Sequence, residues 1–118
     1  MALFILIIFL IVLCYISKHF ALLVVTGNSM YPTYKDGDVV LLYKTDKFDI
    51  GDVVVVTDPS ISNHTIIKRL LAKTYIKSEY RYWIEGDNKE VSKDSRYFGH
   101  IKKDAIEGKI ITWKKKKH

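Results

Sequence analysis

Hydrophobic residues are distributed unevenly along this 118-residue chain. Residues 1–16 form one continuous apolar run without a charged side chain. Ser17, Lys18 and His19 interrupt the run, and residues 20–25 resume it. Beyond that point the apolar residues come in short segments separated by turns. The pattern predicts one long apolar helix followed by a domain of a different kind.

As a helix, the apolar run is almost long enough to cross a lipid bilayer. Its span is roughly 24 Å at ~1.5 Å per residue, against about 30 Å for the hydrocarbon core. A helix extended to Lys18, whose ammonium group can snorkel to the surface, would just cross the core, at some cost in hydrophobic mismatch. A cleaved signal peptide needs a basic start and a small-residue cleavage site, and a buried core helix needs a polar stripe. The run has none of these, so we predict a transmembrane anchor over 1–19 and a second domain over 20–118.

The second domain has the pattern of short β-strands. Runs rich in β-branched or aromatic residues are bounded by glycines and by turn segments such as 58–60 and 86–88. The runs that open with Asp38 and Asp52 are almost continuously apolar, which predicts strands buried on both faces. Strands are predicted over 38–43, 52–57, 65–71, 80–85 and 109–113. The expected fold class is therefore mainly β: a compact barrel-like or sandwich-like core on one N-terminal transmembrane helix.

Charge and composition limit the kinds of partner that the chain is expected to bind. The net charge is +6, and four lysines stand together at 114–117. Such a run fits both a solvated terminus and attraction to anionic lipid headgroups. No nucleic-acid recognition module is visible, so the predicted partner is the lipid bilayer. The single cysteine, Cys14, lies in the apolar run, and the four histidines have no metal-ligand spacing. We expect no disulfide, metal or cofactor, and the sequence carries no signal for an oligomeric state.

Ser29 is the first candidate for chemistry. It follows Gly-Asn and precedes Met-Tyr-Pro-Thr, a sequence suited to a tight, exposed bend. A serine on such a bend can act as a nucleophile, and backbone N–H groups there can stabilise an oxyanion. The same heptapeptide is also typical of a plain surface turn.

Lys68 is the second candidate. In a strand, its side chain shares one face with Ile66 and Leu70. Burial between apolar neighbours lowers the pKa of an amine from ~10.4, because the charged form is penalised, and the neutral amine can serve as a general base. An edge lysine that protects a sheet from aggregation has the same pattern.

A third segment, 86–96, carries Ser92, Asp94 and Arg96. Asp94 and Arg96 can form an ion pair, and Ser92 can hydrogen-bond to a buried amine. Together with Ser-Met-x-Pro-Thr, Gly-Asp-Val-Val and Lys-Arg, the pattern Gly-Asp-Asn-x-x-x-Ser-x-Asp-Ser-Arg resembles bacterial type I signal peptidases of the compact Gram-positive type. The resemblance covers residues 27–96, most of the second domain.

The resemblance implies a function for each of these residues. Ser29 would be the acylating nucleophile and Lys68 its general base. Ser92 would orient the Lys68 amine, while Asp94 and Arg96 would brace the site.

The resemblance also implies a place and a substrate. The catalytic domain would lie on the extracytoplasmic side of the bacterial plasma membrane, and the substrates would be signal peptides of exported preproteins. Arg69 and Asp87 would pair to hold two strands together. From their places beside Ser29 and Lys68, we predict that three apolar residues line a pocket for the small side chain before the scissile bond: Val25, Met30 and Ile67.

This chain departs from the family pattern at one position, and several other functions stay open. Many members carry a serine where this chain has Gly27, so one donor of the usual oxyanion hole is missing. The alternatives are a conjugation-type or pilin-type Ser/Lys peptidase, an inactive paralogue, and an anchored β-module that only binds exported peptides. A self-cleaving repressor would be cytosolic and carry a DNA-binding domain, and neither feature is visible here.

Overall fold

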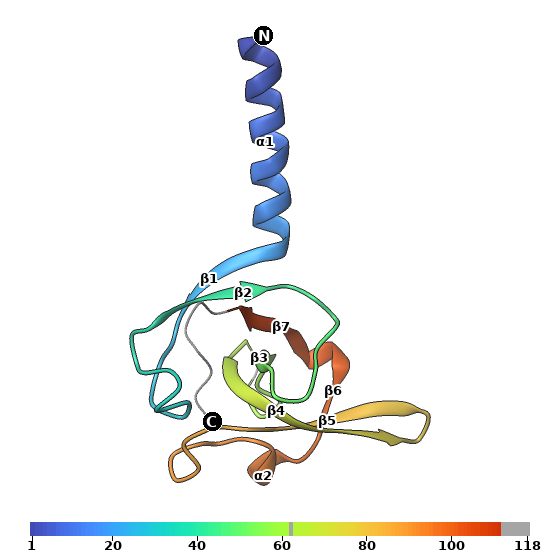
Figure 1. Cartoon of the computed structure of the whole chain (residues 1–118). Helices are drawn as coiled ribbons and strands as arrows, with labels where there is room; N and C mark the ends of the chain where they lie inside the picture. Colours follow the sequence, from blue (N-terminus) through green and yellow to red (C-terminus); the bar gives the residue numbers. More distant parts are fainter. Residues whose placement is uncertain (62, 112–118) are drawn as a thin grey trace.

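The computed structural model describes residues 1–61 and 63–111, which form one helix joined to a curled β-sheet (Figure 1). The long helix, α1, is Ala2–His19, and two short helical segments, α2 and η1, are Ser95–Phe98 and Lys103–Ala105. The strands are β1 (Phe20–Val24), β2 (Val39–Tyr43), β3 (Val53–Thr57), β4 (Thr65–Ile76), β5 (Glu79–Glu85), β6 (Ile101–Lys102) and β7 (Ile106–Ile111).

Helix α1 projects away from the sheet and buries none of its residues (Figure 1). Its mean hydropathy is 2.4 over 18 residues, so it is long and apolar enough to span a membrane. The helix ends at His19, and the chain turns extended at Phe20, whose backbone N–H still donates to the Ile16 carbonyl. Strand β1 therefore begins directly at the end of the helix, without a linker.

The seven strands form one antiparallel sheet in the order β1-β2-β7-β3-β4-β5-β6. The sheet curls into a half-barrel, and β1 and β6 are its edges (Figure 1). This architecture confirms the predicted fold class, a mainly β core with one N-terminal apolar helix. It also brings the end of β1 close to β4, and that approach creates the candidate site.

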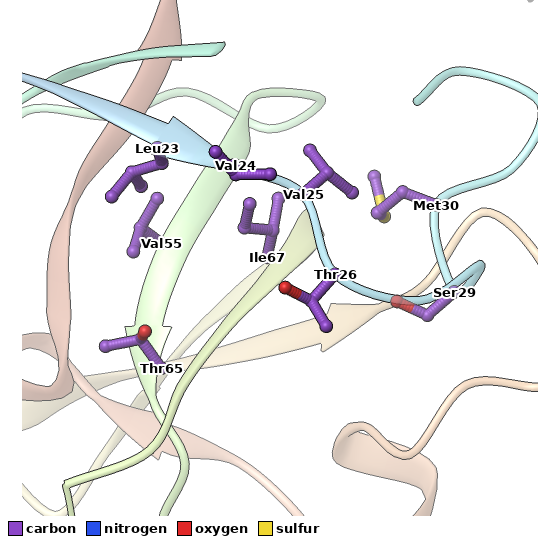
Figure 2. Close-up of a pocket in the computed structure, with 9 residues that line it drawn as sticks. All are labelled: Leu23, Val24, Val25, Thr26, Ser29, Met30, Val55, Thr65 and Ile67. Carbon is purple, nitrogen blue, oxygen red and sulfur yellow. The ribbon is translucent and has the colours of Figure 1, made fainter. Parts of the chain in front are cut away.

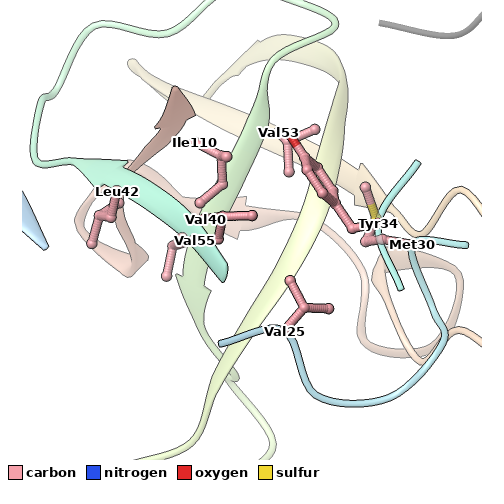
Figure 3. Close-up of a cluster of buried hydrophobic side chains, with 8 residues drawn as sticks. All are labelled: Val25, Met30, Tyr34, Val40, Leu42, Val53, Val55 and Ile110. Atoms are coloured by element: carbon pink, nitrogen blue, oxygen red, sulfur yellow. The ribbon is translucent and has the colours of Figure 1, made fainter. Parts of the chain in front are cut away.

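Strand β3 lies at the centre of the core and is buried on both faces, as its sequence predicts. Val53 and Val55 pack on one face, and Val54 and Val56 on the other. The first face belongs to a cluster that also holds Met30 of the loop after β1 (Figure 3). Because successive side chains of β3 point to opposite faces of the sheet, this one strand contributes to both hydrophobic clusters.

Strand β2 was also predicted to be buried on both faces, and this prediction is wrong. Val40 and Leu42 are buried, but Val39 is 51% exposed. The physical reason is position: β2 lies next to the edge strand β1, and only its inner face meets the core cluster. The outer face of β1 is equally open, with Leu22 70% and Val24 63% exposed.

The predicted strand boundaries need three corrections. Strand β4 runs five residues past the predicted end at 71, because it forms a hairpin with β5 that extends beyond the core. Strand β7 begins at Ile106 rather than 109, because Ile106 and Gly108 pair with β3 around a bulge. The third correction concerns β1, because the sequence analysis predicted no strand in the apolar stretch 20–25. Residues 112–113 and the lysine run 114–117 lie outside the described residues.

Candidate active site

The loop after β1 presents Ser29. Gly27 has φ +84°, a backbone conformation that suits glycine, and its N–H donates to the Asp36 carboxylate over 2.7 Å. Met30 and Tyr34, 1% and 2% exposed, anchor the loop by packing into the first hydrophobic cluster. Ser29 therefore stands on a bend whose neighbours on both sides are fixed.

Lys68 lies on β4 and is buried, only 4% exposed. Its Nζ lies 2.8 Å from the Oγ of Ser29, a hydrogen-bonding distance. Burial lowers the pKa of the Lys68 amine; the carboxylates of Asp94 and Asp58 oppose this shift, and Arg96 adds to it. A neutral amine in contact with a serine hydroxyl is the arrangement that a lysine general base requires.

Asp94 is the centre of the supporting network and is fully buried. Its carboxylate accepts hydrogen bonds from Ser92 Oγ at 2.6 Å, from the Gly86 N–H at 2.8 Å and from Arg96 Nε at 3.0 Å. Burial by itself raises the pKa of Asp94, but the hydrogen bonds from Arg96, Ser92 and the backbone outweigh it and lower the pKa to about 2. Asp94 is therefore a carboxylate at every pH of interest.

The Ser92 hydroxyl lies between Asp94 and the Gly86 N–H, from which it accepts a hydrogen bond of 3.1 Å. In the part of the chain that the structure describes, no hydrogen bond joins it to Lys68. Its orienting action on the amine stays a prediction. What the geometry does show is that Ser92 braces the strand end at Gly86.

Arg69 and Asp87 form a bidentate ion pair, with both nitrogen–oxygen distances 2.8 Å. Arg69 also donates to the Gly51 carbonyl at 2.7 Å, and Thr33 Oγ1 donates to Asp87 at 2.5 Å. The pair thus ties β4 to the turn before β3, to the segment after β5 and to the Ser29 loop. Asp87 has a lowered pKa, since the hydrogen bonds from Arg69 and Thr33 outweigh the effect of burial.

Asn88 is a supporting residue to which the sequence analysis gave no function. Its backbone N–H donates to the Ser29 carbonyl at 2.8 Å, and its side-chain amide donates to the Asn28 carbonyl at 3.1 Å. These two bonds hold the peptide units on either side of the Ser29 Cα. The residue stands inside the recognised motif, directly after Asp87, so the motif contained the signal although the contact is tertiary.

A pocket of about 120 Å³ opens beside Ser29 between β1 and β4 (Figure 2). The three predicted pocket residues, Val25, Met30 and Ile67, all line it. The sequence analysis missed the other lining residues, which come from the edge strand and from across the sheet: Leu23, Val24, Thr26, Val55 and Thr65. The pocket is small and mixes aliphatic walls with hydroxyl groups.

Other chemistries find less support in the described residues. Within 1–61 and 63–111, no group of three His, Cys, Asp or Glu side chains is arranged to hold a metal ion. The reactive pair is a hydroxyl and an amine, and the hydroxyl belongs to Ser29, which lines the pocket. Such a pair is suited to acyl transfer through a serine nucleophile.

Comparison with known proteins decides the family. Residues 7–111 match the family described as Peptidase S24-like. The chain belongs to this family of peptidases. It is a type I signal peptidase-like protein, as the motifs around Ser29 and Lys68 indicated.

Its relatives come from bacteria and from eukaryotes. The chain is 32% identical to mitochondrial ATP-independent inner membrane protease subunit 1a of Arabidopsis thaliana, over 74% of this chain and 66% of the relative. It is 30% identical to mitochondrial inner membrane protease subunit 2 of Schizosaccharomyces pombe, over 85% and 68%. Signal peptidase IB of Staphylococcus aureus is 28% identical, over 73% of each chain. The match spans slightly less than two thirds of the first of these relatives.

Proposed function

We propose that this signal peptidase-like protein is a membrane-anchored serine endopeptidase that removes signal peptides from exported preproteins. The observation that carries the proposal is the 2.8 Å distance between Ser29 Oγ and the buried amine of Lys68. The family supports a peptidase, and the pair supplies a nucleophile and a base in contact.

The reaction proceeds in two acyl-transfer steps. Neutral Lys68 takes the proton of Ser29 Oγ, the oxygen attacks the scissile carbonyl, and the resulting ammonium returns the proton to the leaving amine. The ester formed on Ser29 is then hydrolysed by a water that Lys68 deprotonates in the same way. The Ser29 N–H makes no hydrogen bond in the described part of the chain, so it is available to the oxyanion.

Residues 1–19 act as the membrane anchor in this proposal, and the domain over 20–118 faces the compartment into which preproteins are exported. The outer face beside the anchor is apolar: Leu22 and Val24 of β1 and Val39 of β2 are exposed. Leu22 pairs with Leu41, and Val24 pairs with Val39, so the side chains form adjacent rows. We place this surface at the lipid headgroups, where a signal peptide leaves the bilayer.

Labelling with a serine-reactive probe tests the proposed nucleophile directly. We expect the probe to modify Ser29, and the rate to rise with pH as Lys68 loses its proton. Because burial lowers the pKa of Lys68, the rate should level off clearly below ~10.4, the ordinary lysine value. Intact mass and peptide mapping across a pH series provide the measurement.

The control for the labelling is Ser60→Ala, a change at a serine that hydrogen-bonds to Asp58 instead of a lysine. It should keep full labelling, whereas Ser29→Ala should lose it. An inactive paralogue or a module that only binds peptides would leave Ser29 unlabelled. A labelling rate that fell steadily above neutral pH, with the fold intact, would exclude a lysine base.

Removal of residues 2–19 should separate catalysis from location. We expect cleavage of short soluble peptides to stay within about 3-fold, and cleavage of membrane-embedded preproteins to fall at least about 10-fold, because the effective concentration of enzyme at the membrane is lost. The comparison is made in detergent micelles and in vesicles, with circular dichroism as a check of the fold.

The control for the anchor is an exchange of residues 2–19 for an unrelated apolar helix of equal length. This exchange should restore cleavage of embedded preproteins if the helix acts only as an anchor. An equal loss on both substrates after deletion would mean that α1 supports the fold of the catalytic domain.

A further inference from the structure

Two hydroxyl groups in the pocket beside Ser29 have no part in the proposed mechanism. They belong to Thr26 and Thr65. The hydroxyls of Thr33 and Thr57 donate hydrogen bonds to carboxylates. Those of Thr26 and Thr65 bond to no other group in the described part of the chain, so both are available to a ligand.

The two threonines lie at different places in the pocket (Figure 2). Thr26 lies between Ile67 and Ser29, and its hydroxyl points toward the pocket interior. Thr65 lies at the far end, near Val55. A substrate side chain next to the bond that Ser29 attacks therefore meets Thr26 first.

We propose that Thr26 makes this pocket selective for small side chains that carry a hydrogen-bonding group, serine above all, at the residue before the scissile bond. The inference rests on the proposed function, since it takes Ser29 as the attacking group. The preferred substrate class is then a signal peptide that ends in serine rather than only in alanine.

The physical reason is the balance between desolvation and hydrogen bonding. A pocket with only aliphatic walls disfavours a serine hydroxyl, which loses its water and gains no partner. The Thr26 hydroxyl can both donate and accept, so it replaces that water. Met30 and Ile67 wall the same space, and they exclude larger polar side chains by bulk.

The test compares two peptides that differ only in Ser or Ala before the cleavage point. With the full-length chain in detergent micelles, the ratio of kcat/KM for Ser over Ala should fall about 3-fold to 10-fold in Thr26→Val, which replaces the hydroxyl by a methyl group of equal size. Thr74→Val, an exposed position on β4 outside this pocket, is the matched control, and its ratio should equal that of the unmodified chain. An unchanged ratio in Thr26→Val, or an equal fall in both variants, overturns the inference.

A binding measurement separates this inference from the proposed function. Product-like peptides that end in Ser or Ala are titrated against the Ser29→Ala chain, with and without Thr26→Val. A 3-fold to 10-fold fall in the Ser over Ala affinity ratio supports the pocket assignment, even if Ser29→Ala were still to cleave. An unchanged affinity ratio overturns the assignment while leaving a Ser29-dependent cleavage untouched.

Discussion

Replacement of Ser29 by Ala, or of Lys68 by Ala, will each lower kcat for a preprotein by at least about 10³-fold. In the proposed mechanism the two side chains act as one unit, in which Oγ attacks only as the amine takes its proton, so loss of either should cost nearly as much as loss of both. Lys68→Arg should be equally inactive, because a guanidinium does not give up its proton at a usable pH. Turnover of a preprotein in micelles measures the effect.

The control for Lys68 lies on the same strand. Lys73 of β4 sits over the ring of Tyr80, with 4.2 Å from Nζ to the ring centroid, and does not line the pocket. Lys73→Ala removes an exposed lysine side chain from the same strand and should keep normal turnover. If Lys68→Ala kept near-normal turnover while remaining folded, the Ser/Lys assignment would be wrong.

Gly86→Ala is expected to be the next most damaging change, although Gly86 contacts no substrate in the proposed mechanism. A Cβ at this position would lie 2.2 Å from Ser92 Oγ and 2.5 Å from the Ser29 carbonyl oxygen. The backbone of the Ser29 loop must shift to relieve the second contact. A displacement of about 1 Å between nucleophile and substrate costs on the order of 10²-fold in rate. We expect a loss of that size in kcat, measured well below the melting temperature.

Gly108→Ala provides the comparison for Gly86. Its Cβ would lie 2.2 Å from the Tyr43 carbonyl oxygen, a clash of the same kind between β7 and β2. Both variants should melt at a lower temperature, but only Gly86→Ala should lose kcat at a temperature where both are folded. If the two lost activity in proportion to stability, the effect of Gly86 would be on folding and not on the position of Ser29.

The contact between Ser29 and Lys68 was easier to predict from sequence than the contacts that support it. Ser29 and Lys68 lie 39 residues apart, yet local motifs around each one named the pair that the fold brings within 2.8 Å. Asn88 stands in one of these motifs, but its contacts depend on where the end of β5 meets the Ser29 loop, and the motif does not specify that meeting. The hydroxyl of Ser92 bonds to Asp94 and Gly86, two contacts that the sequence analysis did not predict, while its orienting action on Lys68 stays a prediction.

For the fold, the sequence predicted burial correctly for β3, a central strand covered on both faces. It failed for the strands at and beside the β1 edge of the sheet. The run of valines in β3 is apolar on every position because both faces are covered. The similar run in β2 has one face open, and the apolar residues there look the same in sequence as buried ones. Strand β1 follows an apolar helix without a break, so its apolar residues do not mark where the helix ends and the strand begins.

The direct passage from α1 into β1 limits the distance between the end of the apolar helix and Ser29. His19 closes the helix, its carbonyl accepts from the Lys44 N–H at 2.7 Å, and the next residue is already paired in the sheet. Ser29 comes ten positions after His19, so the proposed nucleophile stands no more than about 36 Å from the end of the helix. If the proposed function holds, a peptide bond would be cut only when it lies at the same height above the membrane as Ser29. The spacing between apolar stretch and cleavage point would then discriminate among exported chains independently of the side chains that the pocket accepts.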